Sequence, residues 1–172
     1  MPIRPAQTSN DRSDFVYVTI SVENEIMKNI ARNVAATATG FFIGSVINFS
    51  LITVGMSVFP LPEGTDVTSM DSVRAAMGTL PPQNFLFPLA GHALGTLVGA
   101  FLAAKLAIGN RAFPALAIGG LFLLGGIAMI LNCGGPIWFA TADLLLSYIP
   151  MAWLGKKLAV GRGTSNLQSD GE

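Results

Sequence analysis

Long apolar runs alternate with short polar breaks along most of this 172-residue chain. The four runs cover residues 34–59, 85–104, 113–131 and 137–154. Within these runs, Asp143 is the only acidic or basic residue apart from a histidine. A helix needs about 20 apolar residues to cross the hydrocarbon core of a bilayer, so each run is long enough, or nearly long enough, to span it. The pattern predicts an all-α membrane protein built as a four-transmembrane-helix bundle.

These spans divide the chain into an N-terminal segment at 1–33, the bundle at 34–159 and a short tail at 160–172. Apolar residues make up 51% of the chain and charged residues 12%, and the mean hydropathy is +0.57. A soluble helical protein would need polar stripes at the helical period, whereas these runs are apolar on every side. The formal net charge is zero. We therefore expect contact with membrane lipid and no binding of nucleic acid.

Lysine and arginine residues are concentrated on one side of the predicted membrane. Nine of the ten lie in the N-terminal segment, in the link between spans two and three, or after the end of span four. The loop between spans one and two holds only Arg74. Because basic loops stay in the cytoplasm, both termini are expected there, and this arrangement requires an even number of spans. The charge pattern thus agrees with the count of four.

The N-terminal segment has no clear single structure in its sequence. Apolar residues alternate over 15–22, which is typical of a strand in isolation, and 24–30 resembles an amphipathic turn of helix leading into the first span. Since no partner strand is visible, we expect residues 1–13 to be disordered and the rest to lie at the membrane interface. No small-residue cleavage site follows the apolar stretch, so we expect the segment to be retained.

The loop at 60–84 is the longest connection between spans. Thr68 is followed three residues later by Asp71, a helix start signal. Met70, Val73 and Met77 then share one helical face. This pattern predicts a short amphipathic helix that lies on the outer membrane surface or over the end of the bundle.

Span four contains Pro150 well inside its apolar run. Proline removes a backbone donor and clashes with the preceding turn, so we expect a kink or an end to regular hydrogen bonding there. Trp138 and Trp153 lie near the two ends of the same span, where amphipathic rings favour the membrane interface.

Small residues recur every four positions in the first two spans. Such stripes allow two helix backbones to approach closely, and van der Waals packing then drives association within lipid. The stripe in span two consists of Gly91, Gly95, Gly99 and Ala103. The stripe in span one consists of Ala36, Gly40, Gly44 and Asn48. We expect these two stripes to pack within the chain or between chains, with a substrate path along bare backbone as the alternative.

His92 and Asp143 are the strongest candidates for a functional site. Each lies thirteen residues before a lysine at the inner end of its span, so both have similar depth in the membrane. An aspartate in lipid costs about 3 kcal/mol and should find a partner inside the bundle. We expect an intramembrane His92–Asp143 pair, supported by Asn48 or Thr53 depending on the tilt of span one. The pair either fixes helix register or forms a proton or ligand site.

The remaining sequence holds little that supports enzymatic chemistry. Cys133 is the only cysteine, which excludes an intramolecular disulfide, and it is expected to be a buried or interfacial thiol or a cross-link between protomers. Glu63, Asp66 and Asp71 lack the spacing of a calcium loop. No nucleophile elbow, phosphate loop or zinc motif is present. We therefore expect no enzyme activity, no metal and no cofactor.

The stretch at 44–159 resembles a family of uncharacterised small bacterial membrane proteins with four transmembrane helices. The resemblance is carried by Phe-Pro-Leu-Pro-Glu-Gly at 59–64, the small-residue pattern and Ala-Ala-Lys-Leu-Ala of 93–107, Gly-Gly-Ile-Ala at 125–128 and Pro-Ile-Trp-Phe at 136–139. The extension at 1–33 departs from the family's shorter N-terminus. The resemblance implies a bacterial inner-membrane bundle and no particular activity.

These observations favour a non-enzymatic scaffold or accessory subunit of the inner membrane, with both termini in the cytoplasm. It would act by packing against itself as a homo-oligomer or against another membrane protein. The alternative function is a small channel or a proton-coupled transporter that uses His92 and Asp143. A continuous polar path past Asp143 would favour transport, and a sealed core would favour packing.

Overall fold

A computed structural model describes residues 11–161, with side chains from residue 15 onward. Every regular element in this part of the chain is helical, which confirms the all-α prediction. The elements are α1 (Asp11–Val58), α2 (Met70–Met77), the short helix η1 (Pro82–Phe85), α3 (Leu86–Leu106), α4 (Ala112–Cys133), α5 (Ile137–Leu146) and α6 (Ile149–Val160). Four segments are long and apolar enough to cross a bilayer, namely Phe15–Val58, Pro82–Leu106, Ala112–Cys133 and Ile137–Val160. The architecture is that of a multi-pass membrane protein.

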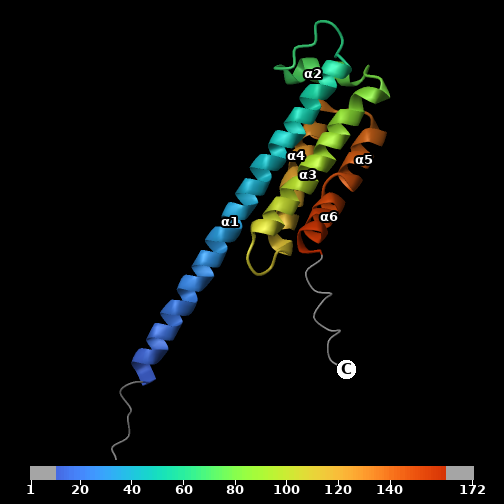
Figure 1. Cartoon of the computed structure of the whole chain (residues 1–172). Helices are drawn as coiled ribbons and strands as arrows, with labels where there is room; N and C mark the ends of the chain where they lie inside the picture. Colours follow the sequence, from blue (N-terminus) through green and yellow to red (C-terminus); the bar gives the residue numbers. More distant parts are fainter. Residues whose placement is uncertain (1–10, 162–172) are drawn as a thin grey trace, which may run out of the picture.

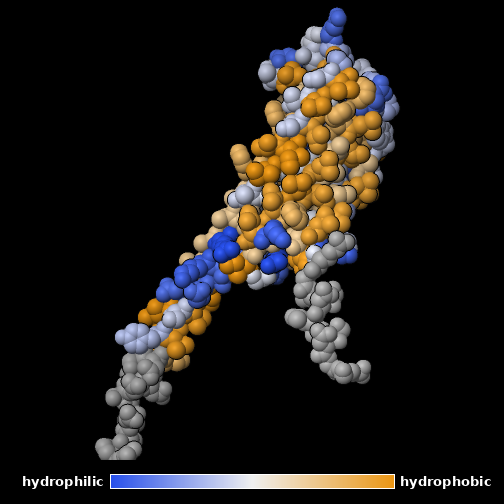
Figure 2. Space-filling view, in the orientation of Figure 1, coloured by the Kyte–Doolittle hydropathy of each residue, from blue (hydrophilic) through white to orange (hydrophobic). Residues whose placement is uncertain are grey.

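The helix α3 lies at the centre of the bundle and packs against α1, α4 and α6. Figure 1 shows the start of α1 and the end of α6 at one end of the molecule, with α2 covering the other end. The face of the bundle that Figure 2 shows is almost entirely apolar, as expected for helices that face lipid. The expected hydrophobic spans therefore form a single packed body.

The first helix is much longer than its predicted span. At 1.5 Å per residue its 48 residues extend over about 72 Å, and its N-terminal half projects beyond the other helices (Figure 1). The strand-like interpretation of 15–22 is wrong, because these residues are helical and exposed, and the predicted boundary at residue 33 falls inside α1. Extending an existing helix adds one hydrogen bond per residue and avoids the cost of a new nucleus. The disorder expected for residues 1–13 and the tail at 160–172 fall largely outside the described residues.

Backbone-to-backbone packing joins α1 to α3 along the two small-residue stripes. A Cβ atom added at Gly95 would lie 2.7 Å from the carbonyl oxygen of Gly44, and one at Gly99 would lie 2.7 Å from the carbonyl oxygen of Gly40. A Cβ at Gly91 would lie 2.9 Å from the Asn48 side chain. All of these approaches are closer than a real Cβ allows. Glycine is therefore required for the observed separation of the two helices.

Span four is interrupted, as its proline predicts. The helix α5 ends at Leu146 and α6 begins at Ile149, with Ser147 and Tyr148 between them. Tyr148 leaves the helical region, with φ −114° and ψ −81°. Pro150 is the cause, because it donates no hydrogen bond to the preceding turn and restricts the backbone before it.

The helix predicted in the loop between the first two spans forms as α2, but its start differs from the expected one. Ser69 is the N-cap and accepts a 3.4 Å hydrogen bond from the Ser72 amide. Thr68 instead donates its amide and its hydroxyl to Asp66, at 2.8 Å and 2.7 Å, in a local turn that competes with capping. These hydrogen bonds from Thr68 hold the pKa of Asp66 below its usual value. Arg74 then donates to the carbonyl of Leu131 at 2.9 Å, which ties α2 to the end of α4.

Candidate functional site

His92 and Asp143 meet inside the bundle, although 51 residues separate them in sequence. The Nδ1 atom of His92 lies 2.8 Å and 2.9 Å from the two carboxylate oxygens of Asp143. The Asp143 side chain is 1% exposed and that of His92 is 15% exposed. The carboxylate is therefore removed from lipid and water, and the histidine retains one accessible edge. The equal depth of the two residues in their spans predicts this contact.

Tyr148 is the third member of the cluster. Its hydroxyl donates to the Oδ2 atom of Asp143 at 2.7 Å and lies 3.1 Å from Nδ1 of His92. Gly126 of α4 makes room for the phenol, because a Cβ atom there would overlap the Tyr148 hydroxyl. The polar trio, meaning His92, Asp143 and Tyr148 from here on, satisfies the carboxylate with donors from two sides.

Tyr148 was not predicted as a site residue from its position in the sequence. It lies five positions after Asp143, and in an unbroken helix the two side chains would point to different faces. The break at residues 147–148 turns Tyr148 back toward the carboxylate. Pro150 was the available signal that the helix geometry would change nearby.

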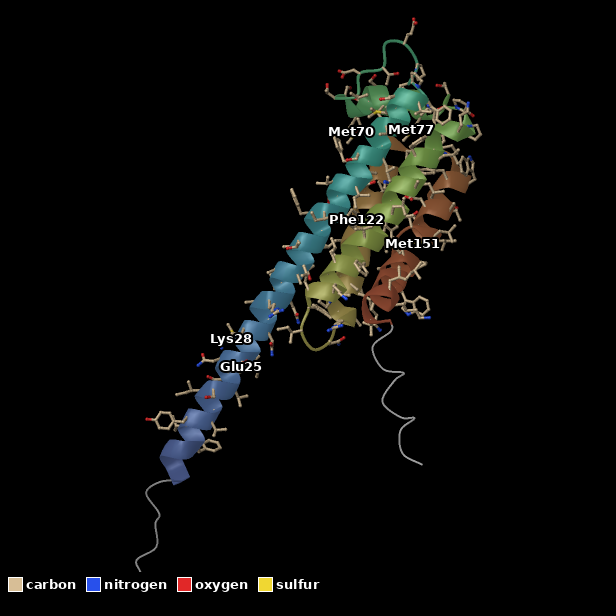
Figure 3. The ribbon with its side chains drawn as sticks, viewed as in Figure 1. Glu25, Lys28, Met70, Met77, Phe122 and Met151 are labelled. Atoms are coloured by element: carbon tan, nitrogen blue, oxygen red, sulfur yellow. The ribbon has the colours of Figure 1, made fainter. Side chains whose placement is uncertain are left out.

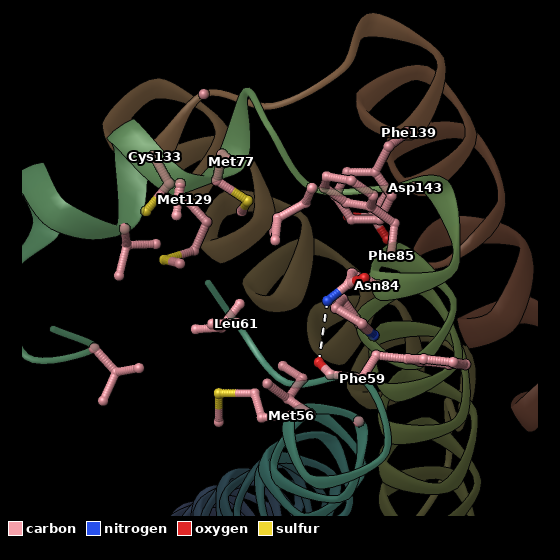
Figure 4. Close-up of a pocket in the computed structure, with 18 of the residues that line it drawn as sticks. Met56, Phe59, Leu61, Met77, Asn84, Phe85, Met129, Cys133, Phe139 and Asp143 are labelled. Carbon is pink, nitrogen blue, oxygen red and sulfur yellow. Dashed lines mark hydrogen bonds between the residues drawn. The ribbon is translucent and has the colours of Figure 1, made fainter. Parts of the chain in front are cut away.

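A cavity of about 540 Å³ opens above the trio, at the end of the bundle covered by α2. Figure 4 shows it between α1, α2 and α4, with Phe85, Phe139 and Asp143 along one side. Its walls are almost entirely apolar, and the ionisable groups that reach it are His92 and Asp143 at its inner end and the Cys133 thiol near α2. Asp143 lies six residues into α5, or about 9 Å along the helix. A cavity of this size fits a small organic molecule.

On the other side of the trio the bundle is closed by small side chains. Ala100, Ala103, Ala104 and Ala115 are fully buried, together with Ile118. Gly155 of α6 packs against the α3 backbone, where a Cβ atom would lie 2.5 Å from the carbonyl oxygen of Leu97. Within the described residues, the polar surface at Asp143 therefore opens toward the α2 end and not through the bundle.

The two supporting residues predicted on span one have different positions. Asn48 faces α3 at Gly91 and Gly95, and its Oδ1 atom is buried without a hydrogen-bond partner. Thr53 is exposed and donates at 2.9 Å to the carbonyl of Phe49, one turn earlier in its own helix. The structure therefore does not bring Thr53 to the trio. Two further hydroxyls, on Thr96 and Ser147, were not predicted from the sequence and are buried without a hydrogen-bond partner near this level.

Cys133, the last residue of α4, is a buried free thiol. Its Sγ atom lies 3.5 Å from the Sδ atom of Met70 on α2. Among residues 11–161, no group of three or more histidine, cysteine, aspartate or glutamate side chains is placed to hold a metal ion.

No protein-family model, curated protein or solved structure matches this chain. Its function must therefore be argued from the site itself.

Proposed function

We propose that this protein is a non-enzymatic membrane protein that binds an apolar small molecule in the cavity above the trio. The observation that carries the proposal is a hydrogen-bonded polar cluster at the inner end of an otherwise apolar cavity. Binding sites for small molecules combine apolar walls with a few convergent polar groups that fix orientation. Intramembrane ionisable residues are costly and mark such sites.

The protonation of the trio indicates which polar group the ligand carries. Nδ1 of His92 faces Asp143, and Nε2 has no hydrogen-bond partner among the described residues. A pair with no net charge is the least costly in lipid. It is either an imidazolium with a carboxylate, or a neutral imidazole that accepts a proton from a carboxylic acid. In both forms Nε2 carries a hydrogen, so the site donates and selects a ligand with an acceptor such as a carbonyl.

A carrier is the second candidate, and the helix break beside the trio favours it. Discontinuous helices line substrate sites in many transporters, where unwound backbone can coordinate a substrate or ion. The break at residues 147–148 adjoins Asp143, and the buried hydroxyl of Ser147 lies within it. The closed packing below the trio would then belong to one state of an alternating cycle. Proton uptake by proteoliposomes that requires Asp143 would support this candidate.

A function in packing alone has less support from the geometry than ligand binding has. The stripes with Gly40, Gly44, Gly95 and Gly99 are used within the chain, between α1 and α3. The exposed N-terminal half of α1 remains available to a second copy or another membrane protein. The asymmetry of basic residues supports a location of both termini in the cytoplasm, and the resemblance noted in the sequence supports the bacterial inner membrane.

The test uses benzophenone and diphenylmethane, which have similar shapes and differ by one carbonyl. Benzophenone should raise the melting temperature of the detergent-purified protein more than diphenylmethane does. His92→Phe should remove the difference, whereas Trp153→Phe, at the other end of span four, should preserve it. Irradiation should attach benzophenone to cavity residues such as Met77 and Met129. Equal stabilisation by both compounds, or labelling spread over the lipid-facing surface, would contradict the proposal.

A further inference from the structure

Sulfur atoms gather where α2 meets the end of α4. Met70 and Met77 lie at the two ends of α2, and Met129 lies one helical turn before Cys133 on α4. Cys133, Met129 and Met77 all line the cavity, and Figure 4 shows their side chains on the same side of the view. The contact of 3.5 Å between Cys133 Sγ and Met70 Sδ joins the two helices directly. We call these four residues the sulfur cluster.

The cluster holds the chain's only cysteine and three of its seven methionines. Figure 3 labels Met70 and Met77 on α2, while Met151 lies far from them on α6. Met27 lies on the projecting part of α1. Methionine also fills apolar space without any ligand role. A ligand role therefore has to be argued from the donor set and its geometry.

We propose that the sulfur cluster binds a soft monovalent metal ion, Cu⁺ or Ag⁺. Thiolate and thioether sulfurs select such ions over Mg²⁺ or Ca²⁺. Binding converts the Cys133 thiol and the ion into a metal thiolate and a released proton. The thiolate carries one negative charge and the ion one positive charge, so the complex is neutral. A neutral complex suits this apolar cavity wall, whereas a divalent ion would leave an uncompensated charge there.

The separation of the two sulfurs fits this chemistry. With metal–sulfur bonds of about 2.3 Å, as in zinc thiolates, two ligands of a trigonal site lie roughly 4 Å apart. The observed 3.5 Å needs only a small expansion. Methionine side chains rotate easily, so thioethers from the cluster can complete the coordination. Met70 is 53% exposed, which gives an ion a route to the buried thiol from the α2 side.

The first experiment measures Ag⁺ binding to the purified full chain, in competition with a chelator of known affinity. We expect one ion per chain, with a proton released on binding. Removal of one sulfur ligand should weaken the affinity for Ag⁺ at least about tenfold. Loss of a residue that only supports a metal ligand already weakens metal affinity by about this factor, and loss of a direct ligand should cost no less. This loss is expected for Met70→Leu and Met129→Leu, and a larger one for Cys133→Ala. Met151→Leu and Met27→Leu are matched controls and should bind as the unchanged chain does.

The methionine variants separate a built site from an ordinary thiol. If Cys133→Ala abolishes binding while Met70→Leu and Met129→Leu behave like Met151→Leu, the ion binds a lone thiol and the proposal is wrong. Unchanged binding by Cys133→Ala would also overturn it. Leucine conserves volume, and thermal melts of each apo variant check that the fold is kept. X-ray absorption of the Cu⁺ form gives an independent count, with two or more sulfur neighbours expected and one sulfur contradicting the cluster.

Discussion

Tyr148 donates a 2.7 Å hydrogen bond to Asp143 across the break in span four. The interaction joins residues five positions apart that a continuous helix would separate. It gives the carboxylate a second donor besides His92, and it places a phenol against Gly126 of α4. The stability of the trio therefore depends on α3, α4 and both halves of span four.

The His92–Asp143 contact should appear as a coupling energy. In a double-mutant cycle with His92→Ala and Asp143→Ala, we expect the two single effects to differ from additivity by about 0.5–3 kcal/mol. His92→Ala should be the more harmful single change, since it leaves the carboxylate buried with Tyr148 as its remaining partner. Unfolding in a denaturing detergent measures the free energies. Additive single effects at neutral and at higher pH would mean that the pair contributes no joint stabilisation.

Gly126→Ala should destabilise the protein by about 1–3 kcal/mol, because the added methyl group overlaps the Tyr148 hydroxyl and overpacks the site. Gly125→Ala is the matched control, since a Cβ atom there meets nothing within 4 Å. The control should be neutral or stabilising by about 0.5–1 kcal/mol through helix propensity. Thermal melts of the two variants compare them. Equal melting temperatures would show that the phenol is not held against α4.

Gly95→Leu should separate α1 from α3 and lower the melting temperature sharply. A side chain at Gly95 would meet the backbone of Gly44, which cannot move aside without shifting the helix. Gly120→Leu adds the same side chain to α4 at a position where a Cβ atom has no neighbour within 4 Å. We expect this control to retain most of its stability. If both variants melt alike, close backbone packing does not determine the separation of α1 and α3.

Both termini should be cytoplasmic. Reporter fusions placed after Lys105 and after Lys157 should report the cytoplasm, and a fusion within 64–77 should report the outside. The reason is that nine of ten basic residues lie on one side of the four spans. A C-terminal fusion that reports the outside would reverse the orientation and the side from which the cavity opens.

The amino-acid sequence by itself determined the helical spans and much of their packing. Apolar run length identifies four crossings because lipid leaves the backbone no partners outside a helix. The four-residue spacing of glycines places them on one face, and equal depth aligns His92 with Asp143. These are local or periodic properties of the chain, so they can be read before any fold is known.

Other features were decided only by the tertiary structure. Apolar and polar residues alternate over 15–22 as they do in a strand, yet these residues are helical because they extend α1. Tyr148 reaches Asp143 only because Pro150 interrupts span four and Gly126 leaves space on another helix. The cavity and the Cys133–Met70 contact exist only where α2 folds over α4. Each depends on distant segments meeting in three dimensions, which spacing along one chain does not specify.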